Sequence, residues 1–125
     1  MSCCCNPGVR IRYYAVCACS GASDTGQIGD RAARQLAEEK IAKMSCTVAI
    51  AVGDQEIMDW TVAATAVVAI DGCEKDCSRK VLESRGFTDI AHVRVTDLGM
   101  VKGKTPVTEE AIARVVAATR ERLGK

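Results

Sequence analysis

The stretch that decides the fold is Val67-Val68-Ala69-Ile70-Asp71-Gly72-Cys73-Glu74-Lys75-Asp76-Cys77. Its first residues are apolar on both faces, which is typical of a buried strand in a parallel sheet. We expect this strand to stop near Asp71, where Gly72 allows a turn into a helix that carries Cys77. One thiol therefore lies at the end of a strand, and a second lies in the first turn of the helix that follows. α/β sheets usually place their chemistry at such an edge.

Outward from this stretch, strand-like and helix-like segments alternate along the chain. The pattern predicts strands at residues 10–19, 41–46, 66–70 and 87–97. It predicts helices at residues 25–39, 55–65 and 74–85, and a last helix that Thr108 caps. Residues 47–53 are ambiguous, because this apolar run could extend the second strand or form a loop after Cys46. The alternation predicts an α/β fold, a single small doubly wound domain with a four-stranded mainly parallel sheet (order 2-1-3-4) and helices on both faces.

Apolar periodicity indicates which helix faces are buried. In the first helix Ile28, Ala32 and Leu36 recur every four residues, and Ser23 or Asp24 is suited to cap it. The last helix has an apolar stripe that consists of Ile112, Val115, Val116, Thr119 and Leu123. We interpret Trp60 as a core residue of the second helix. His92 is interpreted as a surface or half-buried strand residue and is not assigned to a site.

Composition limits the classes of function. The chain has 125 residues, 48% of them hydrophobic, a net charge of +1 and few aromatic residues. We therefore expect one globular domain at residues 9–125, preceded by a flexible Cys-rich segment at residues 1–8. Nothing in this composition predicts a nucleic-acid or membrane partner. The sequence does not predict a protein partner or an oligomeric state.

The eight cysteines are many for this length. No apolar signal region opens the sequence, so we expect a cytoplasmic protein whose thiols stay reduced. Cysteine-rich chains of that kind bind metals or use thiols in catalysis more often than they form disulfides. Cys3, Cys4 and Cys5 are adjacent and are expected in an exposed terminus, or alternatively in an auxiliary metal or redox arm.

The predicted strand order brings distant cysteines to one edge. Cys46, Cys19 and Cys73 fall at the carboxyl ends of the second, first and third strands, which are neighbours about 4.8 Å apart. Cys77 joins them from the helix after the third strand. Four thiolates at this edge could hold one Zn²⁺ ion in a tetrahedron with Zn–S distances of about 2.3 Å. Asp71 is expected either to orient the metal ligands without binding the metal itself or to cap the third helix.

The same residues carry a family resemblance. Cys19-Ser20-Gly21-Ala22-Ser23-Asp24-Thr25-Gly26-Gln27 and the triplet Asp71-Gly72-Cys73, followed by Cys77, resemble the motifs of the DGC-domain family of zinc-binding proteins. Cys46 after Met44-Ser45 matches that family's remaining cysteine. The resemblance implies zinc ligands at Cys19, Cys46, Cys73 and Cys77. It implies no reaction.

The sequence leaves four alternatives open. Cys17 could replace Cys46 as a ligand, and thiolates also suit iron or copper. Cys19 could be the nucleophile of an enzyme, because its loop loosely resembles the phosphocysteine loop of sugar phosphotransferase IIB domains. The pair Cys73 and Cys77, or Cys17 and Cys19, could serve thiol redox chemistry or metal transfer.

Overall fold

The computed structural model describes residues 12–125, and its sheet has the predicted order and direction. The strand order is β2-β1-β3-β4, and every neighbouring pair is parallel. The strands are β1 (Tyr14–Ala18), β2 (Lys43–Met44), β3 (Ala66–Asp71) and β4 (Ile90–Arg94). The helices are α1 (Asp24–Glu38), α2 (Thr47–Ala51), α3 (Gln55–Val62), α4 (Cys77–Ser84) and α5 (Glu109–Leu123), with a 3₁₀ turn η1 at Val95–Leu98.

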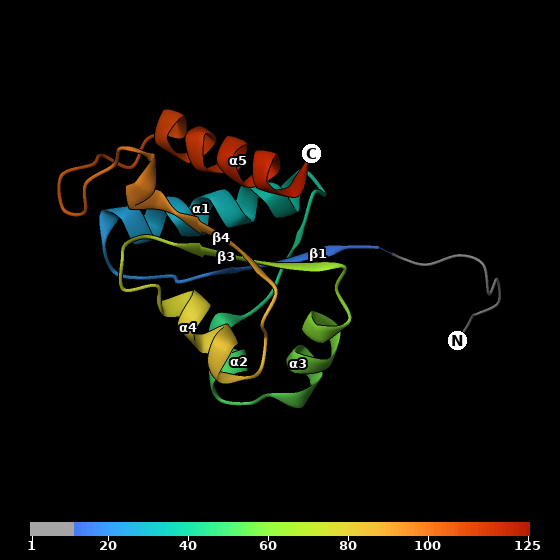
Figure 1. The fold of residues 1–125 in the computed structure, drawn as a ribbon. Coiled ribbons are helices and arrows are strands. Elements are labelled where there is room, and N and C mark those ends of the chain that lie inside the picture. Colours follow the sequence, from blue (N-terminus) through green and yellow to red (C-terminus); the bar gives the residue numbers. More distant parts are fainter. Residues whose placement is uncertain (1–11) are drawn as a thin grey trace.

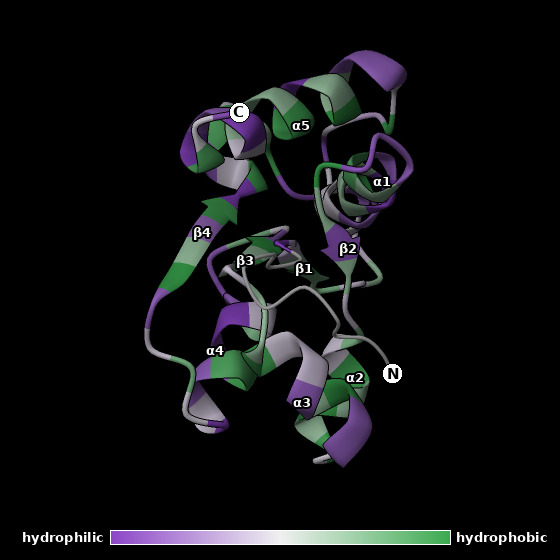
Figure 2. Ribbon diagram, turned by 90° about the vertical axis from the view of Figure 1, so that its right-hand side faces the viewer, coloured by the Kyte–Doolittle hydropathy of each residue, from purple (hydrophilic) through white to green (hydrophobic). Residues whose placement is uncertain are grey.

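The helices cover both faces of the sheet, as predicted. Figure 1 shows α1 and α5 together on one face and α2, α3 and α4 on the other. Figure 2, turned by 90°, shows the sheet between these two helical layers. The fold is therefore a small three-layer α/β domain.

Strand alternation divides the core between the two layers. Val16, Val68 and Ile70 are fully buried against α1 and α5. Cys17 and Ala69 point to the opposite face. There they form a smaller cluster with Ile50, Leu82 and Val67. The predicted stripes hold, since Ile28, Ala32 and Leu36 of α1 are fully buried. In α5 the residues from Ile112 to Thr119 in the stripe are buried and Leu123 is partly buried.

Residues 47–53 are the largest departure from the expected secondary structure. They form neither a strand extension nor a loop, because Thr47–Ala51 is the short helix α2. Cys46 is its N-cap, and its Sγ accepts a hydrogen bond from Ala49 N at 3.4 Å. The second strand is accordingly shorter than predicted and ends at Met44.

Smaller corrections concern element ends and one aromatic side chain. β4 stops at Arg94, because the chain then tightens into η1 instead of continuing as a strand to residue 97. α4 begins only at Cys77. Trp60 is half-buried and not a core anchor, and its ring packs against Tyr13 with centroids 5.9 Å apart.

Some expectations fall on residues 1–11, which lie outside the described part. These include the flexible segment 1–8, its Cys3, Cys4 and Cys5, and the start of the first strand. From residue 12 onward, no helix combines the length and the apolar character needed to cross a membrane.

Candidate functional site

Four cysteines lie at the carboxyl edge of the sheet or just beyond it. Cys19 directly follows β1, Cys46 follows β2 by two residues, and Cys73 follows β3 by two residues. Cys77 is the first residue of α4. Cys19 and Cys73 are half-buried, and Cys46 and Cys77 are exposed. The topology thus carries all four to one side of the domain.

Two glycines allow the loops of Cys19 and Cys73 to approach each other closely. A Cβ on Gly72 would come within 2.5 Å of Gly26 N and 2.7 Å of Gly26 Cα, both backbone atoms. Gly26 lies in the first turn of α1, where its N–H donates to Ser23 Oγ at 3.0 Å. Because a side chain at residue 72 would push this turn away, glycine is required for the close approach. Ser23, and not Asp24, is the helix cap.

Asp71 ties the end of β3 to the start of α4. Its carboxylate is 1% exposed and accepts hydrogen bonds from Ser78 N at 2.7 Å and Arg79 N at 3.1 Å. These contacts satisfy backbone donors in the first turn of the helix. They also set the span of the Cys73–Cys77 loop. Asp71 therefore fulfils the helix-capping alternative, with partners seven and eight residues away.

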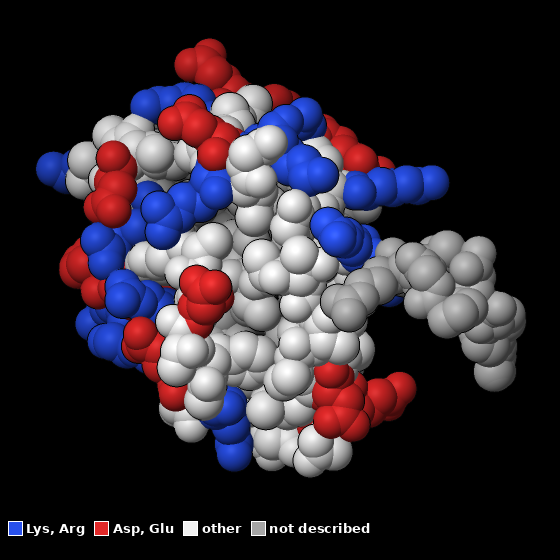
Figure 3. Space-filling view, turned by 45° about the vertical axis from the view of Figure 1, so that its right-hand side comes forward, with Lys and Arg blue, Asp and Glu red and all other residues white. Residues whose placement is uncertain are grey.

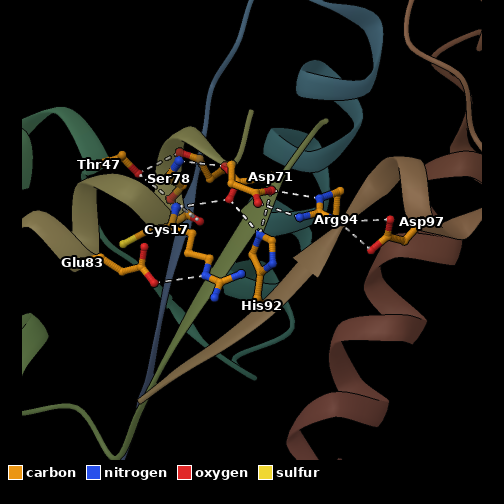
Figure 4. Close-up of polar contacts among 11 residues, drawn as sticks. Cys17, Thr47, Asp71, Ser78, Glu83, His92, Arg94 and Asp97 are labelled. Carbon is orange, nitrogen blue, oxygen red and sulfur yellow. Dashed lines mark hydrogen bonds and ion pairs between the residues drawn. The ribbon is translucent and has the colours of Figure 1, made fainter. Parts of the chain in front are cut away.

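β4 adds two basic side chains to this carboxylate network. Figure 4 shows His92 and Arg94 reaching the loop after β3, with dashed lines to acidic partners. His92 Nε2 lies 2.9 Å from Asp71 Oδ2 and 3.5 Å from Asp76 Oδ1. Arg94 donates to both Asp76 oxygens, at 2.9 and 2.6 Å. This guanidinium holds the pKa of Asp76 below its ordinary value.

Within residues 12–125, only Asp71, Asp76 and His92 place three or more possible ligand atoms within 4.8 Å of one another. These atoms already have partners. Both Asp71 oxygens accept backbone N–H groups, and both Asp76 oxygens accept from Arg94. We therefore interpret the group as a network that fixes the Cys73–Cys77 loop rather than as a cation site.

The sulfurs of the candidate zinc ligands do not form a cluster as close as that of Asp71, Asp76 and His92. No three sulfurs in the described part of the chain fall within 4.8 Å of one another. Cys19 and Cys46 line one hollow of about 330 Å³, together with Trp60 and Arg34. Cys73 lies elsewhere on the edge, where Lys102 Nζ approaches its Sγ to 3.5 Å.

Cys17 differs from the other described cysteines. It is fully buried in β1, and burial raises the pKa of its thiol to about 11. The neighbouring side chains of Ser45 and Thr47 lower this pKa and only partly offset the effect of burial. A thiol with such a pKa gives up its proton to a metal reluctantly, since the thiolate is the ligand form.

A loop at residues 99–107 completes the edge. Asp24 Oδ1 accepts from Gly103 N at 2.8 Å, and Asp24 Oδ2 accepts from Thr105 N at 3.0 Å. These hydrogen bonds lower the pKa of Asp24, so the carboxylate stays charged. They hold the loop, and with it Lys102, beside Cys73. The sequence suggested Asp24 as a helix cap, but gave no signal for this role.

Comparison with known proteins places the chain in a family. The DGC domain matches residues 15–119, and the chain belongs to the DGC domain family. The chain is also similar to the anaerobic and virulence modulator AnvM of Pseudomonas aeruginosa, with 25% identity over 87 residues. That match covers 70% of this chain and 66% of AnvM, slightly under two thirds of its length. No solved structure matches the chain.

Proposed function

We propose that the protein binds one Zn²⁺ ion through Cys19, Cys46, Cys73 and Cys77. The observation that carries this proposal is the strand order β2-β1-β3, which puts three of these cysteines behind three adjacent parallel strands. Soft thiolate ligands suit zinc, and four of them make a closed tetrahedral site. We also propose that residues 9–125 act as one domain in the cytoplasm, where thiols remain reduced.

The contacts at the edge support a site of this kind. The close approach of Gly72 to Gly26 holds the Cys73 loop against the Cys19 loop. Asp71 holds the start of α4 near the end of β3 and so limits how far Cys77 can lie from Cys73. The side chains that would still have to move to bring the four sulfurs together are exposed. Cys46 and Cys77 are exposed, and Lys102 is an exposed lysine that can turn away from Cys73.

A zinc ion held by four thiolates would cross-link three strand ends and the start of α4. It would leave no open position for a water molecule, so hydrolysis is not part of the proposal. The chain's own residues would position the sulfurs, and Asp71 with His92 would keep the loop after β3 in place. We infer a structural or regulatory role, which agrees with the description of the P. aeruginosa relative as a modulator.

The first turn of α1 gives less support to the alternative in which Cys19 is a phosphate-accepting nucleophile. Such an enzyme needs free backbone N–H groups at the helix start. Here Thr25 N donates to Asp24 Oδ1 at 2.7 Å, and Gly26 N donates to Ser23 Oγ. Gln27 N donates to Ser23 O. These three N–H groups at the start of α1 are thus already occupied.

Elemental analysis of the purified, reduced protein tests the zinc proposal. We expect about one zinc per chain, and a large loss of zinc in each of C19S, C46S, C73S and C77S. C17A and the triple variant C3S/C4S/C5S are the matched controls and should keep their zinc. A protein without bound metal would refute the proposal. Zinc loss in C17A with retention in C46S would instead assign Cys17 as the fourth ligand.

A further inference from the structure

A second hollow lies at the opposite edge of the sheet from the cysteines. It has a volume of about 440 Å³ and is formed where β1 begins and where α1 passes into β2. Four cationic side chains line it, from Arg12, Lys40, Lys43 and Lys125. No Asp or Glu is among the residues that line this hollow. A pocket lined by several cationic side chains concentrates ions of the opposite sign.

These four cations are not neutralised by the described part of the protein. None of them has a carboxylate within 4.0 Å among residues 12–125, although Arg31, Arg34, Arg79, Arg94 and Arg120 all do. Glu39 precedes Lys40 directly, but it pairs with Arg120 at 3.6 Å. The cationic field of the hollow is therefore open to a ligand. Figure 3 shows Lys and Arg side chains beside the point where the described chain begins.

Aromatic rings lie close to two of the ammonium groups. Lys43 Nζ lies 5.4 Å from the centroid of the Tyr13 ring and 5.6 Å from that of Trp60. Lys125 Nζ lies 5.5 Å from the Tyr14 ring. Cation–π contacts orient an ammonium group without cancelling its charge. The rings thus limit the positions of flexible side chains that would otherwise spread into solvent.

The backbone presents Lys40 in an unusual conformation. Its φ is +60°, a region that residues other than glycine, Asn and Asp seldom adopt. Ile41 N and Ala42 N both return to Leu36 O, which makes the turn from α1 to β2 tight. A lysine occupies this position although glycine would fit the turn better.

We propose that this hollow binds a small polyanion of the phosphate class. The anion would meet Lys40 and Lys43 on one wall and Arg12 beside β1, with the tyrosine rings at its border. The proposal is independent of the zinc site, because the two sites lie at opposite edges of the sheet. Inorganic pyrophosphate is a suitable probe, since its charge and size match several cations in one pocket.

Isothermal titration calorimetry of the full chain with pyrophosphate tests the proposal. At low ionic strength we expect saturable binding with Kd below about 1 mM, weakened at least about tenfold in K40E/K43E. The control K80E/K104E changes the net charge equally, but at exposed positions away from the hollow, and should bind within about twofold of wild type.

The outcomes separate the possible sources of binding. An absence of saturable binding up to about 10 mM pyrophosphate would overturn the proposal. Equal weakening in both double variants would also overturn it, because only net charge would then matter. Binding that survives K40E/K43E but disappears in C19S would overturn it too, by assigning the anion to a metal at the cysteine edge. Circular dichroism is the check that K40E/K43E is folded.

Discussion

Asp71 and His92 meet across neighbouring strands, with Nε2 of His92 2.9 Å from Oδ2 of Asp71. The same buried carboxylate accepts two backbone N–H groups of α4. One side chain thus joins β3, β4 and the helix that begins with Cys77. The aspartate before Gly72-Cys73 therefore ties the thiol loop to its neighbours, even though it is not a proposed ligand.

Asp71→Asn should destabilise the protein by about 2 kcal/mol, because an amide has a single oxygen and its NH₂ group would face an N–H donor. Urea denaturation monitored by circular dichroism measures this loss. We also expect lower zinc content, since the loop from Cys73 to Cys77 loses its support. D89N, at an exposed position, should leave both quantities unchanged. A D71N protein as stable as wild type would show that the network is dispensable.

Gly72→Ala should destabilise the protein by about 2–3 kcal/mol, because the new Cβ would lie 2.5 Å from Gly26 N and neither backbone can yield cheaply. Gly21→Ala is the matched control in the same region. Its Cβ would meet only Cys19 Sγ, at 3.6 Å, which is an ordinary contact. We expect the control to change the free energy of unfolding by less than about 0.5 kcal/mol. Similar values for both variants would refute the close packing of the two loops.

Acid should weaken the fold through Asp76. Arg94 lowers the pKa of this carboxyl group in the folded state from the ordinary 3.8, so the ion pair stabilises the fold above that pH. This contribution is lost as the pH falls through the lowered, folded-state pKa. D76N should be less stable than wild type at neutral pH and should approach it at low pH. Urea midpoints measured across the acidic range check this, and a constant difference at every pH would contradict it.

Asp24→Ala should loosen the loop at residues 99–107. The carboxylate accepts from Gly103 N and Thr105 N, so its removal exposes both amides to solvent exchange. Hydrogen–deuterium exchange by NMR should show faster exchange at these two amides, with little change in β3. D30A, on the same helix, removes only contacts to Ser20 and Arg34 and serves as the control. Unchanged exchange in D24A would mean that other contacts hold the loop.

The strand order and the helical layers could be predicted because they follow from periodicity and from the alternation of elements. The buried stripe from Ile28 to Leu36 allows one interpretation, and the turn signal at Gly72 identifies the β-branched run from Val67 to Ile70 as a strand. Residues 47–53 do not, because a short apolar run fits a strand, a loop or a helix equally well. In the structure Ala49 N donates to Cys46 Sγ at the start of the helix, and the sequence gives little signal for this cap because thiols are not usual caps.

The edge contacts were harder to predict, because they depend on register and on distant loops. His92 reaches Asp71 only because Asp71 pairs with Arg94 in the β3–β4 register, which places His92 on the same face. Asp24 finds its partners 79 and 81 residues further along the chain. The sequence could nominate Cys19, Cys46, Cys73 and Cys77 for one edge. It could not show how far apart their sulfurs lie.

Alkylation rates should separate Cys17 from the proposed ligands. The pKa of Cys17 is raised to about 11, so at pH 8 its thiol is protonated as well as fully buried. Iodoacetamide should therefore modify Cys17 only when the protein unfolds, while the exposed Cys46 and Cys77 react in the native state. Added zinc should slow the reaction at Cys46 and Cys77 and leave the Cys17 rate unchanged. Peptide mass spectrometry over time measures each site, and native-state modification of Cys17 at the rate of Cys46 would contradict the burial of the β1 thiol.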